Sequence, residues 1–361
     1  MDIAGFCTQS SVIIVAGKGG VGKTTVSAAM ARTAARSGLS VLIVELEGKS
    51  GLPSALGHPE LLTYDEVVLS NEGAKAADGR PMAEIRSRTL TPDDALLEYL
   101  ADHGLRRVSK RLVNSGALDV VATAVPGIRD ILVLGKVKQL ERARRADVIV
   151  VDAPAAGHAI TFLTSAQGLL DSARVGPIRT QAADVVDLLS DGARCQVVLV
   201  TLPEETPVNE TVETAYKLED RVGTSLGPVV VNGIYPHLDH LEADPIEAAA
   251  AAGITLGPGE AEALRAAAEF RRRREEVQAE QVARLADALP LPQVWLPNLF
   301  TTEIGLGEID QLADALAAGL ETLPEIAAGP GGRPESAAGP GGGPESASGP
   351  GGRSESAESA S

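Results

Sequence analysis

The stretch of sequence that decides the fold is Gly17-Lys18-Gly19-Gly20-Val21-Gly22-Lys23-Thr24-Thr25. From Gly17 to Thr24 it matches the pattern G-x-x-x-x-G-K-[ST], in which backbone N–H groups surround the phosphates of a nucleotide. Its glycines can adopt positive φ and bring the backbone close to a dense anion. Lys23 adds a charge near the β- and γ-phosphates, and the Thr24 hydroxyl suits Mg²⁺. The stretch therefore predicts a site for ATP and Mg²⁺ to which all of these residues contribute.

The segments on either side of this loop have the pattern that such a site requires. Residues 11–16, Ser-Val-Ile-Ile-Val-Ala, form a short apolar, β-branched run, as expected of a buried parallel strand. Residues 24–36 are rich in alanine and predict a helix, with Gly38 just past its end. The phosphates would then lie at a helix N-terminus, where the helix dipole favours anions.

A second lysine, Lys18, stands where the general pattern allows any residue. Alone, a lysine in an exposed loop is ordinarily just solvated. Within the string K-G-G-x-G-K-T-T it indicates a deviant Walker A loop. Such a loop is typical of a branch of these proteins that works as a dimer enclosing nucleotide between its protomers.

Composition and charge narrow the class of protein. The chain has 361 residues, 44% of them apolar and 2% aromatic, so its core must consist mainly of Val, Leu, Ile and Ala. The net charge of −17 argues against nonspecific binding to nucleic acid or anionic membranes. Cys7 and Cys195 have no second Cys or His at metal-ligand spacing. With no signal peptide and no run of ~18 apolar residues, these features predict a cytoplasmic protein with reduced thiols.

Short apolar runs that predict buried strands recur along the chain, with helical stretches between them. They are residues 41–44, 148–151, 197–200, 229–231 and 293–296. This alternation predicts an α/β fold, a P-loop NTPase with a doubly wound, mostly parallel sheet, over residues 1–326.

Residues of about 75–140 differ and predict a helical subdomain, inserted between the second strand and the strand that ends at Asp152. Thr91-Pro92-Asp93-Asp94 is a helix start, with a threonine cap and a proline in the first turn. Residues 95–100 and 112–121 carry apolar residues at helical spacing. Residues 160–190 are expected to add helices to the same subdomain.

The C-terminal part of the chain has two further features. Residues 260–289 predict a long charged helix, whose run Arg271-Arg272-Arg273-Arg274-Glu275-Glu276 is typical of a solvated face with i,i+4 pairs. Residues 327–361 form a Gly/Pro/Ser/Glu repeat with almost nothing to bury, so we expect a disordered tail.

An acid ends one of the apolar strands. Residues 146–152, Ala-Asp-Val-Ile-Val-Val-Asp, have the form of a Walker B strand, whose aspartate approaches Mg²⁺ through water. The turn that follows reaches Gly157 and His158 and is placed to sense the γ-phosphate. We therefore predict Thr24 and Asp152 as the metal-binding residues, and Gly157 and His158 as part of a switch.

Together these motifs resemble the ArsA family, the arsenite-pump and tail-anchored-protein targeting ATPases within the MinD/ParA group, and its actinobacterial anion-transporting type. The family's switch II reads D-T-A-P-T-G-H-T-L-R-F-L, and residues 152–163 read D-A-P-A-A-G-H-A-I-T-F-L. Its switch I reads T-D-P-A-H-N-L-S-D-A-F-G, and residues 46–57 read L-E-G-K-S-G-L-P-S-A-L-G.

Shorter segments extend the resemblance over residues 10–322. Pro126-Gly127-Ile128 is similar to the family's P-G-I-D-E, and Leu202-Pro203-Glu204 with Glu210-Thr211 to its P-E…E-T segment. Val230-Val231-Asn232 is similar to the strand end whose asparagine reads adenine, and Leu296-Pro297 to the loop on the purine side.

The resemblance implies an ATPase in which two protomers face each other across two ATP molecules. Lys18 would reach into the opposite site and help to neutralise the transferring γ-phosphate, much as an arginine finger does. Glu47 matches the family's water-positioning aspartate. The expected catalytic residues are therefore Lys18, Glu47 and Asp152, while Asn232 and Pro297 would bind the base.

Several positions depart from the family pattern. Glu47 is one methylene longer than aspartate, and Gly48 follows it in place of proline, which predicts slow hydrolysis. Alanines stand in switch II at 153, 156 and 159, where the family has threonines. The family's metal-thiolate cysteines are absent and the chain has only three methionines. Arsenite stimulation and a Met-rich groove for membrane anchors are therefore not expected.

Three functions stay open at the level of the sequence. The first is an ArsA-type ATPase, a homodimer or a heterodimer with a paralogous ATPase, whose nucleotide state controls binding of a client or membrane partner. The second is a weakly or non-hydrolysing interaction subunit of a heterodimer, favoured by Glu47 and the threonine-poor switch II. The third is a ParA/MinD-like positioning ATPase, which the net charge and the lack of a C-terminal amphipathic helix disfavour. No nucleic-acid partner is expected.

Overall fold

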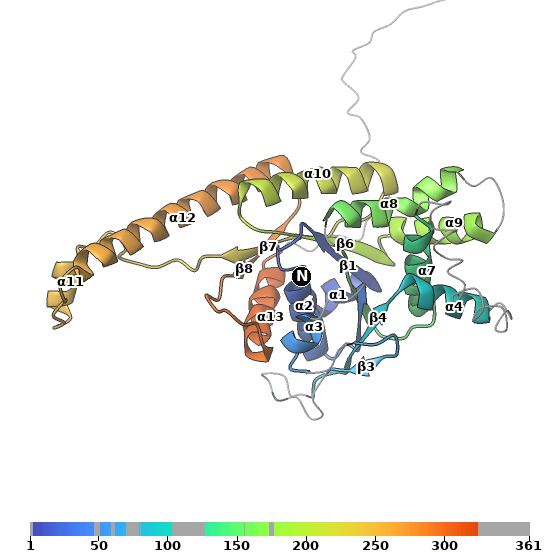
Figure 1. Ribbon diagram of the computed structural model, residues 1–361, viewed down its shortest axis with the longest axis horizontal. Helices are drawn as coiled ribbons and strands as arrows, with labels where there is room; N and C mark the ends of the chain where they lie inside the picture. Colours follow the sequence, from blue (N-terminus) through green and yellow to red (C-terminus); the bar gives the residue numbers. More distant parts are fainter. Residues whose placement is uncertain are drawn as a thin grey trace, which may run out of the picture. The chain divides into compact units, whose positions relative to one another are not determined.

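One mixed sheet organises the described part of the chain (Figure 1). The computed structural model describes residues 3–46, 51–58, 62–69, 79, 81–102, 127–154, 156–172 and 177–323. The strand order is β3-β4-β2-β5-β1-β6-β7-β8, and neighbours run parallel except β3 with β4. The strands are β1 (Val12–Gly17), β2 (Val41–Leu46), β3 (Val67–Val68), β4 (Ile85–Leu90), β5 (Val148–Asp152), β6 (Cys195–Thr201), β7 (Val229–Ile234) and β8 (Gln293–Pro297).

Helices cover both faces of this sheet. They are α1 (Ile3–Gln9), α2 (Lys23–Arg36), α3 (Gly51–Ala55), α4 (Pro92–Asp102), α7 (Ile128–Arg142), α8 (Ala156–Ser172), α9 (Pro177–Ser190), α10 (Glu205–Val222), α11 (Pro245–Ala251), α12 (Glu260–Ala288) and α13 (Leu306–Glu321). One apolar core joins the sheet to α7, α8, α9 and α10, and a second joins it to α1, α2, α3 and α13. The predicted doubly wound α/β fold with a mostly parallel sheet is therefore confirmed.

The central strand β1 shows why an apolar run is needed beside the phosphate loop. All of its residues are buried, and alternate side chains enter opposite cores. Val12 and Ile14 belong to the core under α8 and α10, and Ile13 and Val15 to the core under α2. Full burial of one such side chain contributes about 1.5–3 kcal/mol, so this strand holds both helical layers in place under the loop.

The edge of the sheet corrects one expectation. Residues 75–140 were expected to be helical, but β4 lies within them and pairs in parallel with β2. Its sequence, Ile-Arg-Ser-Arg-Thr-Leu, has apolar residues only at its two ends and so lacks the continuous apolar run of the other strands. Among the residues of this region that the structure describes, the first helix begins at Pro92, after the predicted cap: the Asp94 N–H donates to Thr91 Oγ1 at 3.2 Å.

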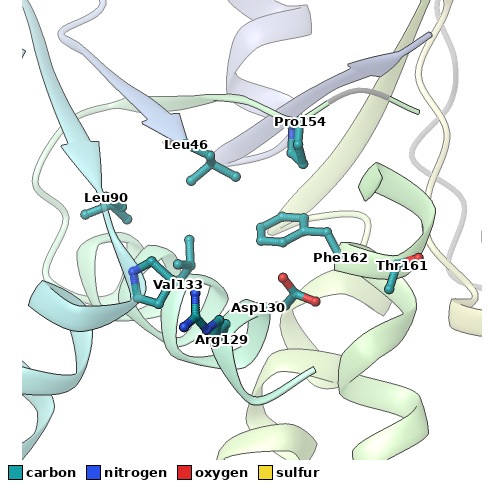
Figure 2. A pocket seen from close by; sticks show the side chains of 9 residues that line it. Leu46, Leu90, Arg129, Asp130, Val133, Pro154, Thr161 and Phe162 are labelled. Carbon is teal, nitrogen blue, oxygen red and sulfur yellow. The ribbon is translucent and has the colours of Figure 1, made fainter. Parts of the chain in front are cut away.

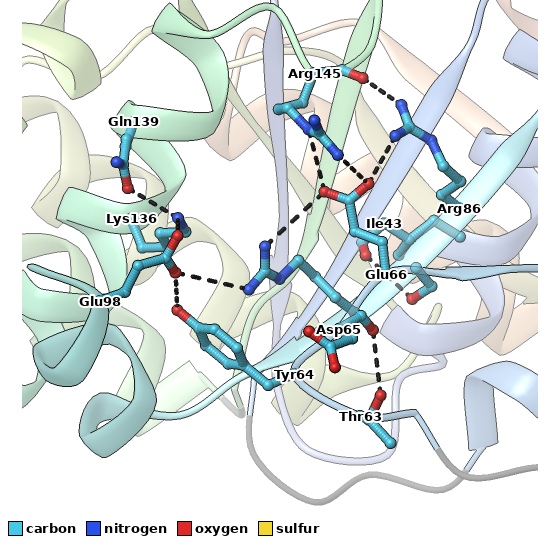
Figure 3. A network of polar contacts seen from close by, with 12 residues as sticks. Ile43, Thr63, Tyr64, Asp65, Glu66, Arg86, Glu98, Lys136, Gln139 and Arg145 are labelled. Atoms are coloured by element: carbon cyan, nitrogen blue, oxygen red, sulfur yellow. Dashed lines mark hydrogen bonds and ion pairs between the residues drawn. The ribbon is translucent and has the colours of Figure 1, made fainter. Parts of the chain in front are cut away.

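An ion-pair network allows arginines to occupy this strand (Figure 3). We call it the β4 network; its members are Tyr64, Glu66, Arg86, Arg88, Glu98, Lys136 and Arg145. Glu66 lies 2.6 Å from Arg86 and 2.9 Å from Arg145, and the Arg88 guanidinium lies 4.2 Å from the centre of the Tyr64 ring. Glu98 accepts hydrogen bonds from Tyr64 and Lys136.

The charges of this network are strongly coupled. Burial works to raise the pKa of Glu66, but the hydrogen bond from Arg145 and the surrounding arginine charges outweigh it, so that pKa lies below its usual value. The pKa of Glu98 is lowered in the same way, against burial, by its hydrogen bonds to Lys136 and Tyr64. Both carboxylates are therefore held in the charged form near neutral pH.

Several expectations fall outside the described residues. The helical segment expected at 112–121 and the tail expected to be disordered are among them. The chain divides into two units, residues 1–326 and 327–361. Within the described residues, no helix combines the length and the apolar character needed to cross a membrane.

Candidate nucleotide site

The phosphate loop lies between β1 and α2, at the carboxyl edge of the sheet. Gly22, which immediately precedes α2, has φ +92°, a conformation that L side chains rarely adopt. A Cβ on Gly22 would lie 2.3 Å from the Asn232 side-chain nitrogen, and one on Gly17 would lie 2.2 Å from the Val200 carbonyl oxygen. The loop is thus packed against the ends of β6 and β7 so closely that glycine is required at both positions.

Thr24 and Asp152 meet at the base of the loop. Thr24 Oγ1 donates a hydrogen bond to Asp152 Oδ2 at 2.7 Å, although the two residues are far apart in sequence. The parallel register places Asp152 beside Val15, one strand away from the loop, and its side chain is fully buried. The structure therefore brings together the two residues predicted to hold Mg²⁺.

The two lysines of the loop have different surroundings. Lys23 is buried, and its ammonium group donates to the Lys18 carbonyl oxygen at 3.0 Å, inside the curve of the loop. Lys18 is about one third exposed and points instead to Glu210 of α10, with 2.8 Å between Nζ and Oε1. Lys23 is thus built into its own site, whereas Lys18 is held at the surface by a carboxylate of the same chain.

Asn232 and Pro297 lie on the far side of the loop. Asn232 Nδ2 donates to the Val21 carbonyl oxygen at 3.0 Å, which ties the end of β7 to the phosphate loop. Pro297 ends β8 and is paired with Ile234 of β7. The two residues expected to bind the base therefore occupy adjacent strand ends, of which only Asn232 has a direct bond to the loop among those recorded in the described residues.

Two functional candidates were missed from the sequence. Glu45, only 1% exposed, lies beside Asp152 in the β2–β5 register and accepts a hydrogen bond from Thr89 Oγ1 at 3.3 Å. An acid within the apolar run of residues 41–46 was the signal that could have identified it. Gln278 of α12 bonds to the backbone next to Asn232, at Gly233 O (3.1 Å) and Tyr235 N (2.8 Å). Nothing in its polar helical surroundings distinguishes it in the sequence.

The switch residues are described only in part. Glu47 lies outside the described residues, between Leu46 at the end of β2 and Gly51 at the start of α3. Gly157 and His158 lie in the first turn of α8, directly after the strand that ends at Asp152. The backbone thus places the start of switch II directly after Asp152, while the roles of Glu47, Gly157 and His158 stay predictions.

A cavity of about 480 Å³ opens beside switch II (Figure 2). It is lined by Leu46, Leu90, Pro92, Arg129, Asp130, Val133, Pro154, Thr161 and Phe162. In Figure 2, Leu46 and Pro154, from the ends of β2 and β5, face Val133 and Phe162 from the helical side. The cavity therefore joins three segments that the sequence had singled out: the start of switch I, the helix after Pro126 and switch II.

The donor set fits a nucleotide with Mg²⁺. The hydroxyl of Thr24 and the buried carboxylate of Asp152 are hard oxygen ligands, of the kind that Mg²⁺ prefers. The close-packed glycine loop ends at the first turn of α2, which offers backbone donors and a helix N-terminus to phosphates. Thr24 and Asp152 would hold the metal, and Gly17 to Thr25 would surround the phosphates.

Comparison with known proteins agrees with this geometry. Residues 10–173 match the family model described as anion-transporting ATPase. The ATPase BagA of Mycobacterium tuberculosis and a putative ATPase of Mycobacterium bovis are each 32% identical over 323 residues, covering 84% of this chain and 92% of those proteins. An arsenical pump-driving ATPase of Escherichia coli is 27% identical over 234 residues, 61% of this chain and 39% of that protein. This chain therefore belongs to the ArsA family of ATPases.

Proposed function

We propose that this protein hydrolyses ATP as a dimer, and that its nucleotide state controls the binding of a client or membrane partner. The observation that carries the proposal is the contact between Thr24 and Asp152 at 2.7 Å, beneath a complete phosphate loop. This contact brings together the residues proposed to bind the metal of a nucleoside triphosphate, next to the loop proposed to bind its phosphates. When bound, Mg²⁺ supplies charge neutralisation at the β- and γ-phosphates.

The residues of the chain divide the work of binding and hydrolysis. The loop backbone and Lys23 bind and orient the phosphates, because Lys23 is buried and already fixed across the loop. Glu47 orients the attacking water from switch I. Lys18 leaves Glu210 and enters the site of the facing protomer, where its charge stabilises the γ-phosphate in the transition state.

The cavity beside switch II supports coupling to a partner. Pro154 follows Asp152 within the same turn, and Phe162 lies on the helix that switch II begins. A movement of switch II with the γ-phosphate would therefore change the cavity wall directly. This gives the nucleotide site a short physical route to the surface formed by α4, α7 and α8.

The two lysines provide the test of this function. Lys23→Ala should lower affinity for a fluorescent ATP analogue by at least ~100-fold, because a buried charge-assisted contact is lost. Lys18→Ala should keep that affinity within about twofold and abolish steady-state phosphate release. Nucleotide binding that survives Lys23→Ala would refute the site, and turnover that survives Lys18→Ala would refute the role in trans.

A second function is favoured by the alanines of switch II. Ala153 and Ala159 are buried and have no hydroxyl to offer a γ-phosphate or a water molecule. In this alternative the chain binds ATP and dimerises with a paralogue without hydrolysing it. Single-turnover assays of the purified protein separate the two functions: release of phosphate excludes the alternative, whereas its absence together with tight ATP binding supports it.

A further inference from the structure

A helical arm, residues 237–270, extends from the body of the ATPase unit (Figure 1). It contains α11, the connections on either side of it and the first third of α12. No residue of α11 is buried, and Ala261 is the buried residue of α12 within the arm. An ion pair between Arg265 and Asp244, at 2.8 Å, holds α11 against α12 at the tip of the arm. Asp244 also caps the N-terminus of α11. The described arm thus has almost no core of its own.

The base of the arm, in contrast, is firmly attached beside the nucleotide site. Gln278 bonds to the backbone on both sides of Ile234, immediately after Asn232. The Arg271 guanidinium lies 4.5 Å from the centre of the Tyr235 ring and 4.9 Å from that of Phe300. Cation–π contacts and buried amide bonds of this kind fix the direction in which α12 leaves the body.

That direction places the arm at the face on which a second protomer would lie. The chain enters the arm from the carboxyl end of β7, the edge of the sheet that holds the phosphate loop and Asn232. α12 has 29 residues, and a helix of that length measures about 43 Å. The part of α12 that precedes Arg271, residues 260–270, extends roughly 16 Å from this attachment. That is far enough to lie along a protomer docked on the nucleotide face.

The surface of the arm has the composition of an interface. Five large apolar side chains on it, Leu238, Ile246, Ile254, Leu264 and Phe270, are between 49% and 62% exposed. Single exposed apolar residues are ordinary, but several on one projection without a core indicate a contact surface.

The charges of the arm are self-complementary. It carries seven acidic residues, two histidines and, as its single arginine or lysine, Arg265; the run Arg271–Arg274 follows directly where the arm joins the body. Arg272 and Arg273 of that run are exposed. A twofold axis that sets two arms antiparallel would place the acidic tip of each beside the basic base of the other, which is the pattern of an isologous contact.

We propose that the arm docks on a second copy of this chain and clasps the dimer across the nucleotide face. The proposal rests on the dimeric function proposed above, and it assigns to the arm a contact that the phosphate loops alone do not make. Because Gln278 ties α12 to the backbone of Gly233 and Tyr235, just after Asn232, the clasp forms most readily when nucleotide fixes the end of β7.

Cross-linking from the tip of the arm tests directly whether the arm contacts a second copy of this chain. Both native cysteines are buried, and burial raises the pKa of each thiol to about 12, so a new surface cysteine will react selectively. Ile254→Cys would carry a benzophenone, with Glu321→Cys, exposed at the C-terminal end of α13, as the matched control. With Mg²⁺ and a non-hydrolysable ATP analogue, Ile254→Cys should give a covalent dimer at least tenfold more abundant than the control.

Dimer affinity provides the second measurement, by analytical ultracentrifugation with the same analogue. The double variant Ile246→Ser, Ile254→Ser should weaken the nucleotide-bound dimer at least tenfold, whereas Val68→Ser, an exposed apolar residue on β3, should change it less than twofold. If the wild type dimerises but the arm variants do so equally well and no intermolecular cross-link forms, the clasp is wrong and the proposed dimer stands. A wild type that stays monomeric with nucleotide overturns both, while ATP binding is judged separately by Lys23→Ala.

Discussion

The phosphate loop and the β4 network lie on the same sheet but are specified in different ways. The loop takes its form from contiguous residues, Gly17 to Thr25, between an apolar strand and an alanine-rich helix. The β4 network draws its charges from residues between Tyr64 and Arg145, and no two neighbours in sequence neutralise each other there.

This difference has consequences for what each region tolerates. The loop is constrained by space, since backbone and side chains of β6 and β7 fill the positions where a Cβ would stand. The β4 network is constrained by charge, since Arg88 is buried and removing a carboxylate leaves the arginine charges less compensated. Changes in the loop should therefore damage nucleotide binding, and changes in the network should damage folding.

The largest effect is expected from Gly22→Ala. The added Cβ would meet the Asn232 side chain at 2.3 Å in a backbone conformation with φ +92°. We expect the affinity for ATP to fall by at least ~100-fold, equivalent to about 2.7 kcal/mol, when measured by titration with a fluorescent analogue. Gly38→Ala is the control, because Gly38 has φ +87° but open space around it. Equal ATP affinities for the two variants would contradict the prediction, because they would show that the close packing at Gly22 does not matter for binding.

A smaller loss, in stability instead of binding, is expected from Glu66→Gln. This removes the charge that Arg86 and Arg145 share, and the Glu66 side chain is only 14% exposed. Breaking this interaction should lower the free energy of unfolding by about 2–3 kcal/mol, below the range of roughly 3–5 kcal/mol for fully buried pairs, because Arg145 is half-exposed. Denaturant unfolding would measure it, with the half-exposed Glu84→Gln as the control at under ~0.5 kcal/mol. Loss of ATP affinity without loss of stability would contradict the assignment of the β4 network to folding.

The stabilities of the wild type and of Glu66→Gln should also depend on pH in different ways. The pKa values of Glu66 and Glu98 are lowered in the folded state, so their contribution is complete above the unfolded value of about 4.3 and is lost as pH falls through the folded pKa. The stability gap between wild type and Glu66→Gln should therefore stay constant from pH 7 to about pH 5 and narrow below about pH 4. A stability difference that grows as the pH falls would show that the charged carboxylate of Glu66 is not its cause.

The smallest effect is expected from Glu210→Gln. Its pair with Lys18 is 34–39% exposed, and such pairs contribute about 0–1 kcal/mol. Stability should be unchanged, while release of Lys18 should raise ATP turnover at low protein concentration by no more than about fivefold. Glu213→Gln, which affects an exposed pair with Lys217 on the same helix, is the control. A fall in turnover would show that Glu210 assists catalysis.

The sequence allowed prediction of the elements that depend on local pattern. The strands at 12–17, 41–46 and 148–152 each begin with a continuous apolar run, and the cap at Thr91 and the helix at 260–288 also appear as expected. β4 could not be recognised, because the partners that make Arg86 and Arg88 acceptable on a strand lie on other elements. Gln278 and Glu45 were missed for a related reason: each acts on a neighbour that is distant in sequence.

The sequence by itself therefore determined the nucleotide site and the family, because a phosphate loop is a contiguous object whose glycines, lysine and threonine are set by local backbone geometry. Only the tertiary structure decided where its partners lie: Asp152 against Thr24, Asn232 against Val21, and Lys18 held by Glu210. It also showed that α12 is attached beside Asn232 at the end of β7 and carries an arm beyond it. These contacts depend on strand order and on long-range packing, which residue spacing along the chain does not encode.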